Sequence, residues 1–221
     1  MYMSYPMILY ENSKIVVIAT FKTTNNKTGN MAQIWILNRN TDPITSVKTG
    51  EDRNICGNCK HRGSSCYVNV AFAPNNIYKK YIKNGYKYGK PKDFLAEDVR
   101  FGAYGDPALI PFNLIKDIAK YSNSYTGYTH QWLTCDQRLK DYLMASVDTY
   151  SEMKQAQSMG WKTFRILGET DEPELFETKC PSDVLTCRQC KKCDGKTSNI
   201  YINVHGPKHK IIKFNQTVKG M

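Results

Sequence analysis

The residues of this chain with the clearest capacity for chemistry are its cysteines, because seven of the eight fall into two short clusters. The first cluster comprises Cys56, Cys59 and Cys66, and the second comprises Cys180, Cys187, Cys190 and Cys193. A Cys-x2-Cys pair brings two thiolates to the same side of a turn, where both can bind one metal ion or cluster. Both clusters therefore predict metal ligands, and zinc, an iron–sulfur cluster and disulfide bonds are the three alternatives.

The spacing of the second cluster favours iron–sulfur over zinc. Cys187, Cys190 and Cys193 follow one another at intervals of three residues, with Cys180 seven residues before the first of them. A Cys-x2-Cys-x2-Cys run is common among ligands of [4Fe–4S] clusters, whereas tetrahedral zinc usually takes its ligands as two separated pairs. Zinc remains the alternative metal.

The first cluster supplies only three cysteines, so a closed zinc site would need a fourth ligand. His61, in the same loop, is a suitable one. An iron–sulfur cluster held by three thiolates would instead leave one iron open, and in radical SAM enzymes that iron chelates S-adenosylmethionine. Their usual spacing is Cys-x3-Cys-x2-Cys, which the Cys-x2-Cys-x6-Cys pattern here does not match. A third alternative is that both clusters converge on shared metal.

The elements that must position these cysteines alternate between strands and helices. Apolar runs at 7–20 and 32–38 predict an N-terminal β-hairpin, and 68–84 predicts a partly helical segment before a basic linker at 85–93. Strands are then predicted near 99–106, 125–132, 143–149, 161–167 and 199–206, with a sixth at 210–214 (KIIKF). Helices are predicted between them, at 107–123, 136–143 and 151–160. This alternation indicates parallel β/α units.

We therefore predict an α/β fold, either an open doubly wound sheet or, as we prefer, a partial (β/α) barrel. Residues 1–221 form a single domain in this interpretation. Residues 1–45 hold the N-terminal strands, 50–95 hold the first cysteine cluster and the basic linker, and 99–215 hold the β/α repeats with the second cluster at 180–193.

Polar side chains recur where the predicted strands end. They are Asp106, His130 with Gln131, Asp148 and His205. Ligands bind at the carboxyl ends of the strands in parallel α/β folds, so these residues are candidate catalytic groups lining a cavity. Helix capping is the alternative for Asp148, which precedes a predicted helix. The isolated Cys135 is interpreted as a small buried residue.

The net charge of +11 and the isoelectric point of about 9.2 favour a polyanionic partner such as nucleic acid. Basic residues would also offset the charge of metal-bound thiolates. No run of about 18 apolar residues is present to span a membrane. The first residues lack a basic segment and a cleavage site, so we predict an intracellular protein with reduced cysteines.

The ordered phrases CGNC, RFGAYGDP, GYTHQW, ASVDTYSEMKQAQSMGWKTFRIL and TCRQCKKCDG resemble the phage proteins known as "gene product 88". The resemblance covers about residues 30–207. It implies a phage or prophage protein in the host-cell cytoplasm, with the fold of a small radical-SAM-like barrel. It implies no particular reaction.

Two functions are compatible with these features. In the first, the protein is an iron–sulfur enzyme with one or two [4Fe–4S] clusters. Asp106, His130, Asp148 and His205 then line the cavity, and S-adenosylmethionine is a candidate ligand of the first cluster. In the second, the cysteine sites are structural, and the basic surface binds nucleic acid or a host protein. A simple electron-transfer protein would leave the strand-end polar residues without a role.

Overall fold

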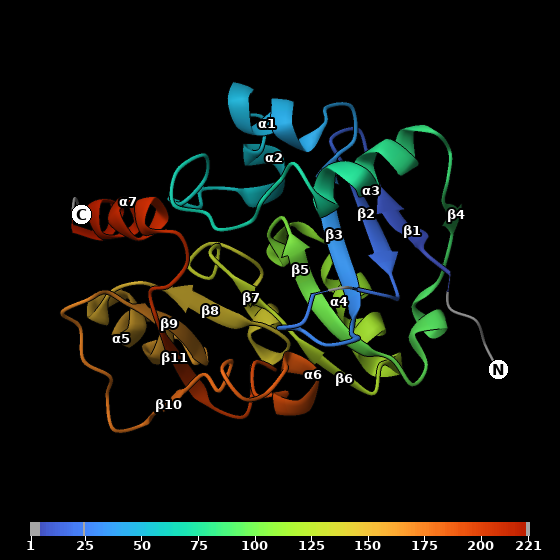
Figure 1. The fold of residues 1–221 in the computed structure, drawn as a ribbon. Helices are drawn as coiled ribbons and strands as arrows, with labels where there is room; N and C mark the ends of the chain where they lie inside the picture. Colours follow the sequence, from blue (N-terminus) through green and yellow to red (C-terminus); the bar gives the residue numbers. More distant parts are fainter. Residues whose placement is uncertain (1–4, 24, 220–221) are drawn as a thin grey trace.

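The computed structural model of this protein describes residues 5–23 and 25–219, whose strands form two sheets (Figure 1). The strands are β1 (Met7–Glu11), β2 (Ile15–Thr20), β3 (Ala32–Asn38), β4 (Lys87–Tyr88), β5 (Asp98–Tyr104), β6 (Ser124–Thr126), β7 (Tyr128–Thr129), β8 (Met144–Val147), β9 (Thr163–Leu167), β10 (Glu177–Lys179) and β11 (Asn199–Asn203). The first sheet has the order β4-β1-β2-β3-β5-β6 and mixes parallel and antiparallel pairs. The second has the order β10-β11-β9-β8-β7 and is parallel throughout.

The α-helices are α1 (Pro43–Thr49), α2 (Arg53–Cys56), α3 (Ala73–Ile82), α4 (Phe112–Tyr121), α5 (Tyr150–Ser158), α6 (Cys187–Cys190) and α7 (Lys208–Lys219). Short 3-10 helices occur at η1 (Pro91–Phe94), η2 (Pro107–Leu109) and η3 (Gln137–Asp141). α4 buries Ile115 and Ile118, and α5 buries Met153 and Ala156. The predicted helices at 107–123 and 151–160 therefore form because their apolar residues recur at helical spacing.

The N-terminal hairpin is confirmed in the antiparallel pair β2–β3, where Ile15 lies opposite Asn38. The apolar run 7–20 proves to hold two strands, because Asn12 turns the chain between β1 and β2. Its side-chain oxygen accepts hydrogen bonds from the backbone N–H groups of Lys14 and Ile15. An Asn that bonds its own backbone in this way is a common turn former.

The two sheets meet at Gly127, which separates β6 from β7. The predicted strand at 125–132 is thus broken, with β6 paired to β5 and β7 paired to β8. A Cβ at Gly127 would lie 2.7 Å from Leu143 Cδ2 and 2.9 Å from Phe101 Cβ, so the close approach requires glycine. Through this break, β3, β5, β6/β7, β8, β9, β11 and β10 form one parallel succession, and the strands described do not close it into a barrel.

Three segments differ from the sequence prediction. Residues 210–214 lie in helix α7 rather than in a sixth strand, because Phe214 is buried on one helical face while Ile212 stays exposed. A short apolar run does not distinguish a strand from a helix. The basic linker 85–93 contains β4, which extends the first sheet beside β1. β10 was not predicted, because Glu177–Lys179 has no apolar run.

Within the described part of the chain, no helix combines the length and apolar character needed to cross a membrane.

Candidate metal centres

The first cysteine loop follows β3 and lies beside the carboxyl ends of β5 and β7. The N–H of Asp106, just after β5, donates to the carbonyl of Ile55 at 2.6 Å. Gln131, just after β7, donates from Nε2 to the Cys56 carbonyl at 3.0 Å and accepts the Asn58 N–H at 3.0 Å. Two of the predicted strand-end residues therefore fix the loop that carries Cys56 and Cys59.

Asp106 is occupied by the protein itself. Its carboxylate accepts hydrogen bonds from the Thr129 hydroxyl at 2.6 Å and the His130 N–H at 2.8 Å. It also accepts the Ala108 N–H at 3.0 Å, which caps η2. Both oxygens thus join the end of β5 to the end of β7, and the geometry gives Asp106 a positioning role.

His61 links the cysteine loop to the end of β8. Its Nε2 lies 2.8 Å from Asp148 Oδ2 and its Nδ1 lies 2.6 Å from the Ser65 hydroxyl. All three residues are buried. Both ring nitrogens are already engaged, so His61 is not free to act as the fourth zinc ligand in this arrangement. The sequence could not show this contact, since 87 positions separate His61 from Asp148.

Asp148 is the most buried charged group near the first loop, with a side chain 1% exposed. Its Oδ2 lies 2.9 Å from Lys60 Nζ, in addition to the contact with His61. Burial alone would raise the pKa of this carboxyl group, but the hydrogen bond from His61 and the charges of His61, Lys60 and His130 lower the pKa to about 2. Capping of α5 is performed instead by Thr149 with Glu152.

His130 stands beside the first thiols. Its Nε2 lies 3.2 Å from the Ser146 hydroxyl. Burial acts to lower its pKa, but a hydrogen bond with Cys59 and the charges of Cys59, Asp106 and Asp148 raise the pKa overall. The chain thus places an imidazole in contact with a cysteine thiol, a pairing that the sequence spacing did not indicate.

The thiols of the first cluster lie near enough to affect one another's ionisation. Burial raises the pKa of Cys56 well above its usual value, and the thiols of Cys66 and Cys59 raise it further. The hydroxyl of Tyr104 is buried and has no hydrogen-bond partner among the described residues. Burial and then Cys56, Asp52 and Cys66 raise its pKa, which places this unpaired donor close to two of the thiols. A buried O–H group with no acceptor is unfavourable, and a thiolate would satisfy it.

The second cluster combines helix α6, beside the amino end of β5, with Cys180, which directly follows the carboxyl end of β10. Its helix α6 is held by Asp98, the first residue of β5, which accepts Arg188 Nε at 2.9 Å and Lys191 Nζ at 2.9 Å. The Cys187 N–H also donates to the carbonyl of Lys27, in the turn before β3, at 2.9 Å. Burial would raise the pKa of Asp98, but hydrogen bonds from Ser124, Lys191, Asn123 and Arg188 lower the pKa to about 2.

The thiols of the second cluster also lie near enough to affect one another's ionisation. Burial raises the pKa of Cys193, and Cys187, Cys180 and Cys190 raise it further, while Arg100 acts to lower it. The Cys193 carbonyl accepts the N–H of Gly127, where the two sheets meet. The backbone contacts of the two clusters are separate, because Gln131 bonds Cys56 while Gly127 bonds Cys193, and convergence on shared metal stays an untested alternative.

The donor set fits a metal that prefers sulfur, although the side chains do not yet adopt a ligating geometry. All eight cysteines are free of disulfide bonds. In the described residues, no three His, Cys, Asp or Glu side chains stand close enough to one point to hold a metal ion. What fits is the chemistry: two groups of thiols that affect one another's ionisation, one beside the unpaired Tyr104 hydroxyl.

His205 and Cys135 lie apart from these residues. His205 is exposed, and its Nδ1 lies 3.0 Å from the carbonyl of Asn203. The described hydrogen bonds do not bring it to Asp106, His130 or Asp148. Cys135, predicted to be buried, is only half-buried; it packs against the hydrophobic core, and burial raises its pKa to about 11.

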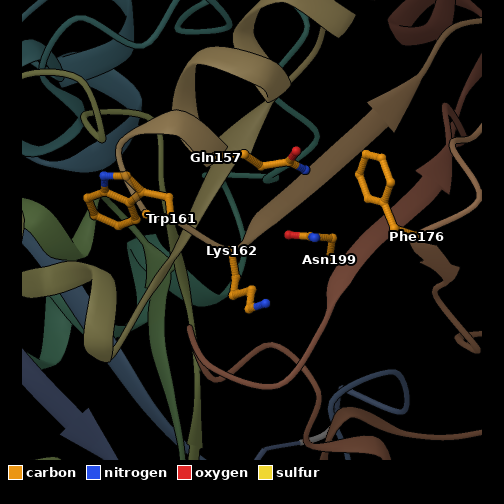
Figure 2. Close-up of a pocket in the computed structure, with 6 residues that line it drawn as sticks. Gln157, Trp161, Lys162, Phe176 and Asn199 are labelled. Atoms are coloured by element: carbon orange, nitrogen blue, oxygen red, sulfur yellow. The ribbon is translucent and has the colours of Figure 1, made fainter.

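Two pockets lie elsewhere, along the second sheet. One, of about 330 Å³, lies at the amino ends of β9 and β11, and Figure 2 shows Gln157, Trp161, Lys162, Phe176 and Asn199 around it. The other, of about 490 Å³, lies at the carboxyl ends of the same strands and is lined by Glu169, Asp171 and Glu172 among others. None of the predicted catalytic residues lines either pocket.

A scan against protein-family models, a search of curated proteins and a search of solved structures each found no match. The resemblance to gene product 88 proteins stays a prediction, and any function must be argued from the residues themselves.

Proposed function

We propose that this protein is an iron–sulfur protein built on an open, radical-SAM-like β/α arrangement, with thiolate ligands in two cysteine clusters. One observation carries the proposal. Each cysteine cluster contains a half-buried cysteine, Cys56 or Cys193, whose thiol pKa is raised first by burial and then by the other thiols of its own cluster. Such a group can ionise only when a cation offsets the thiolates, and a metal ion supplies that charge.

The position of the first cysteine loop supports the radical-SAM-like part of the proposal. The loop follows β3, the first strand of the parallel succession, and lies at the carboxyl edge where α/β proteins bind their ligands. A cluster held there by Cys56, Cys59 and Cys66 would leave one iron open to S-adenosylmethionine and would supply one-electron chemistry. The protein's own groups would position it: Gln131 and Asp106 fix the loop, and His61 with Asp148 anchors its far side.

The second cluster would be a closed site with four thiolates, from Cys180, Cys187, Cys190 and Cys193. Arg100 would lie near its negative charge, because it acts on the pKa of Cys193. Asp98 would hold α6 in place through Arg188 and Lys191. A phage or prophage origin, as the sequence resemblance implies, belongs to the same proposal.

Anaerobic reconstitution with iron and sulfide tests this function. We expect the wild-type protein to retain iron and sulfide and to absorb broadly in the visible range. Each variant removes one thiolate ligand. Cys193→Ser is therefore expected to lose the iron bound by the second cysteine cluster, and Cys59→Ser is expected to lose the iron bound by the first. Cys135→Ser is the matched control and should retain the wild-type iron content. A protein that binds neither iron nor zinc would overturn the proposal.

A second arm of the same experiment tests the open iron. Addition of S-adenosylmethionine should perturb the spectrum of the reconstituted wild-type protein and of Cys193→Ser, but not that of Cys59→Ser. Formation of 5′-deoxyadenosine under dithionite would establish a radical enzyme. If the protein binds iron but shows neither the spectral change nor 5′-deoxyadenosine formation, it is an iron–sulfur protein without the radical function.

A specific surface favours nucleic-acid binding as a second candidate function. Residues 73–92, which include α3 and β4, contain no acidic residue. All of their lysines are exposed: Lys79, Lys80, Lys83, Lys87, Lys90 and Lys92. Tyr88, 69% exposed, lies among them. Lysines interleaved with accessible aromatic rings suit single-stranded nucleic acid, where phosphates meet the cations and bases stack on the rings.

Binding of labelled single-stranded DNA, measured by anisotropy at two salt concentrations, tests this surface. The double variant Lys79→Glu/Lys83→Glu should weaken binding by about tenfold or more and reduce the salt dependence. The control Lys116→Glu/Lys120→Glu makes the same charge change at the same spacing on α4 and should bind nearly as wild type does. Equal losses in both variants would indicate a net-charge effect and count against a defined site.

A further inference from the structure

Arg100 is a half-buried cation on the parallel strands, and no carboxylate among the described residues forms an ion pair with it. It lies in β5, and its Nη2 donates to the Tyr128 hydroxyl at 2.9 Å. Among the described residues, this is the one hydrogen bond of the Arg100 side chain, and none of the ion pairs there includes Arg100. A guanidinium group has five N–H donors, so most of its hydrogen-bonding capacity is unused.

The hydrogen bond from Arg100 continues to a second tyrosine. The hydroxyls of Tyr128 and Tyr67 lie 3.0 Å apart. Since Tyr128 accepts from Arg100, its own hydrogen is free to point to Tyr67, which leaves the Tyr67 O–H as the open end of the chain. Hydrogen bonds in a chain polarise one another, so a phenol joined to a guanidinium in this way is a strong donor.

Ring packing holds the hydrogen-bonded side chains Arg100, Tyr128 and Tyr67 in place, and solvent can reach them at Tyr67. The Tyr128 ring stacks on Phe164 of β9, with centroids 4.9 Å apart, and the Arg100 guanidinium lies 5.4 Å from the Tyr128 ring centroid. Tyr67, in contrast, is 62% exposed.

We propose that Arg100, Tyr128 and Tyr67 form a binding site for the carboxylate or phosphate group of a small-molecule ligand, which enters past Tyr67. The Arg100 guanidinium, which pairs with no carboxylate among the described residues, supplies the charge, and the two phenols supply oriented donors. The nearest anionic candidates within the protein are the thiols of the second cluster, since Cys187 also acts on Arg100. The site requires no metal, so it does not depend on the iron–sulfur proposal.

Calorimetric titration of the reduced, metal-free protein with inorganic phosphate, and separately with acetate, tests this site. We expect saturable binding of at least one anion. Arg100→Gln should weaken that binding by about tenfold or more, and Tyr67→Phe by about fivefold, because each removes a donor to a charged group. Tyr67→Phe changes an exposed side chain and should fold normally, so it tests the site even if Arg100→Gln is unstable.

Two controls make the same chemical changes elsewhere. Arg138→Gln removes a guanidinium that pairs with Asp136 at the surface, and Tyr88→Phe removes an exposed hydroxyl that donates to Glu11. Both should bind the anion as wild type does. Absence of saturable binding of either anion, or binding unchanged in Arg100→Gln and Tyr67→Phe, would overturn the proposal. So would an Arg100→Gln variant that loses iron in reconstitution while its anion affinity is unchanged, because Arg100 would then serve the thiolates.

Discussion

Asp148→Asn is expected to lower the free energy of unfolding by about 3 kcal/mol at pH 7, because it removes a buried charge that contacts Lys60 and His61. The carboxylate is 1% exposed and lies 2.9 Å from Lys60 Nζ and 2.8 Å from His61 Nε2. Asparagine keeps the shape but not the charge, so Lys60 and His61 would lose the carboxylate that they contact. Urea unfolding of both proteins measures the difference.

The effect of Asp148→Asn should depend on pH in a defined direction. The pKa of Asp148 is lowered from its usual 3.8 to about 2, so the folded state favours the ionised form. Its stabilisation is therefore complete above about pH 4 and is lost as the pH falls toward 2. The difference between wild type and variant should shrink over this range. A constant difference would mean that the charge of Asp148 is not what stabilises the loop.

Glu152→Gln is the matched control, because Glu152 contacts the same lysine at 2.9 Å but its side chain is 27% exposed. Glutamine can still accept the backbone hydrogen bonds that cap α5. We expect a loss under about 1 kcal/mol, as for an accessible ion pair. Because Asp148 anchors the first cysteine loop, Asp148→Asn should also lower the iron retained by that loop, whereas Glu152→Gln should not.

The sequence predicted the repeating elements of this fold better than it predicted their ends. β8 and β9 could be predicted because β-branched and aromatic runs end at Asp148 or at a glycine, and α5 because a capping threonine precedes an amphipathic run. The break at Gly127 could not, because it depends on how closely Phe101 and Leu143 approach. The helical conformation of α7 is explained only by a tertiary contact: the Phe214 ring packs on the His61 ring, with centroids 5.4 Å apart.

The same limit applies to the candidate site. Residue type and position identified Asp106, His130 and Asp148 as strand-end residues at one edge, because parallel strands bring their carboxyl ends together, but did not indicate that the first cysteine loop would lie against them. The sequence did not indicate that Asp106 would be saturated by backbone and hydroxyl donors, or that His61 would be a docking residue. Nor did it place α6 of the second cluster beside the amino end of β5, which depends on the pairing of Asp98 with Arg188 and Lys191. Long-range polar contacts of this kind leave no periodic signal.

Glu177→Gln is expected to lower the free energy of unfolding by about 3–5 kcal/mol, because it leaves a buried guanidinium without its counter-ion. Arg165 of β9 is 3% exposed and Glu177 of β10 is fully buried. The carboxylate accepts from Arg165 Nε at 2.9 Å and from its Nη2, and also accepts the N–H of Glu174 at 2.9 Å. Urea unfolding at pH 7 measures the loss.

The double variant Arg165→Met/Glu177→Leu separates charge burial from packing. It removes both ions, so no charge is left uncompensated, and we expect it to be more stable than Glu177→Gln. Asp136→Asn, in the exposed pair with Arg138, should change the free energy of unfolding too little to measure. Since β10 leads directly into Cys180, Glu177→Gln should also lower the metal retained by the second cluster, and the double variant should restore it. A loss as small as that of Asp136→Asn would show that water reaches the Arg165–Glu177 pair and that β10 does not depend on it.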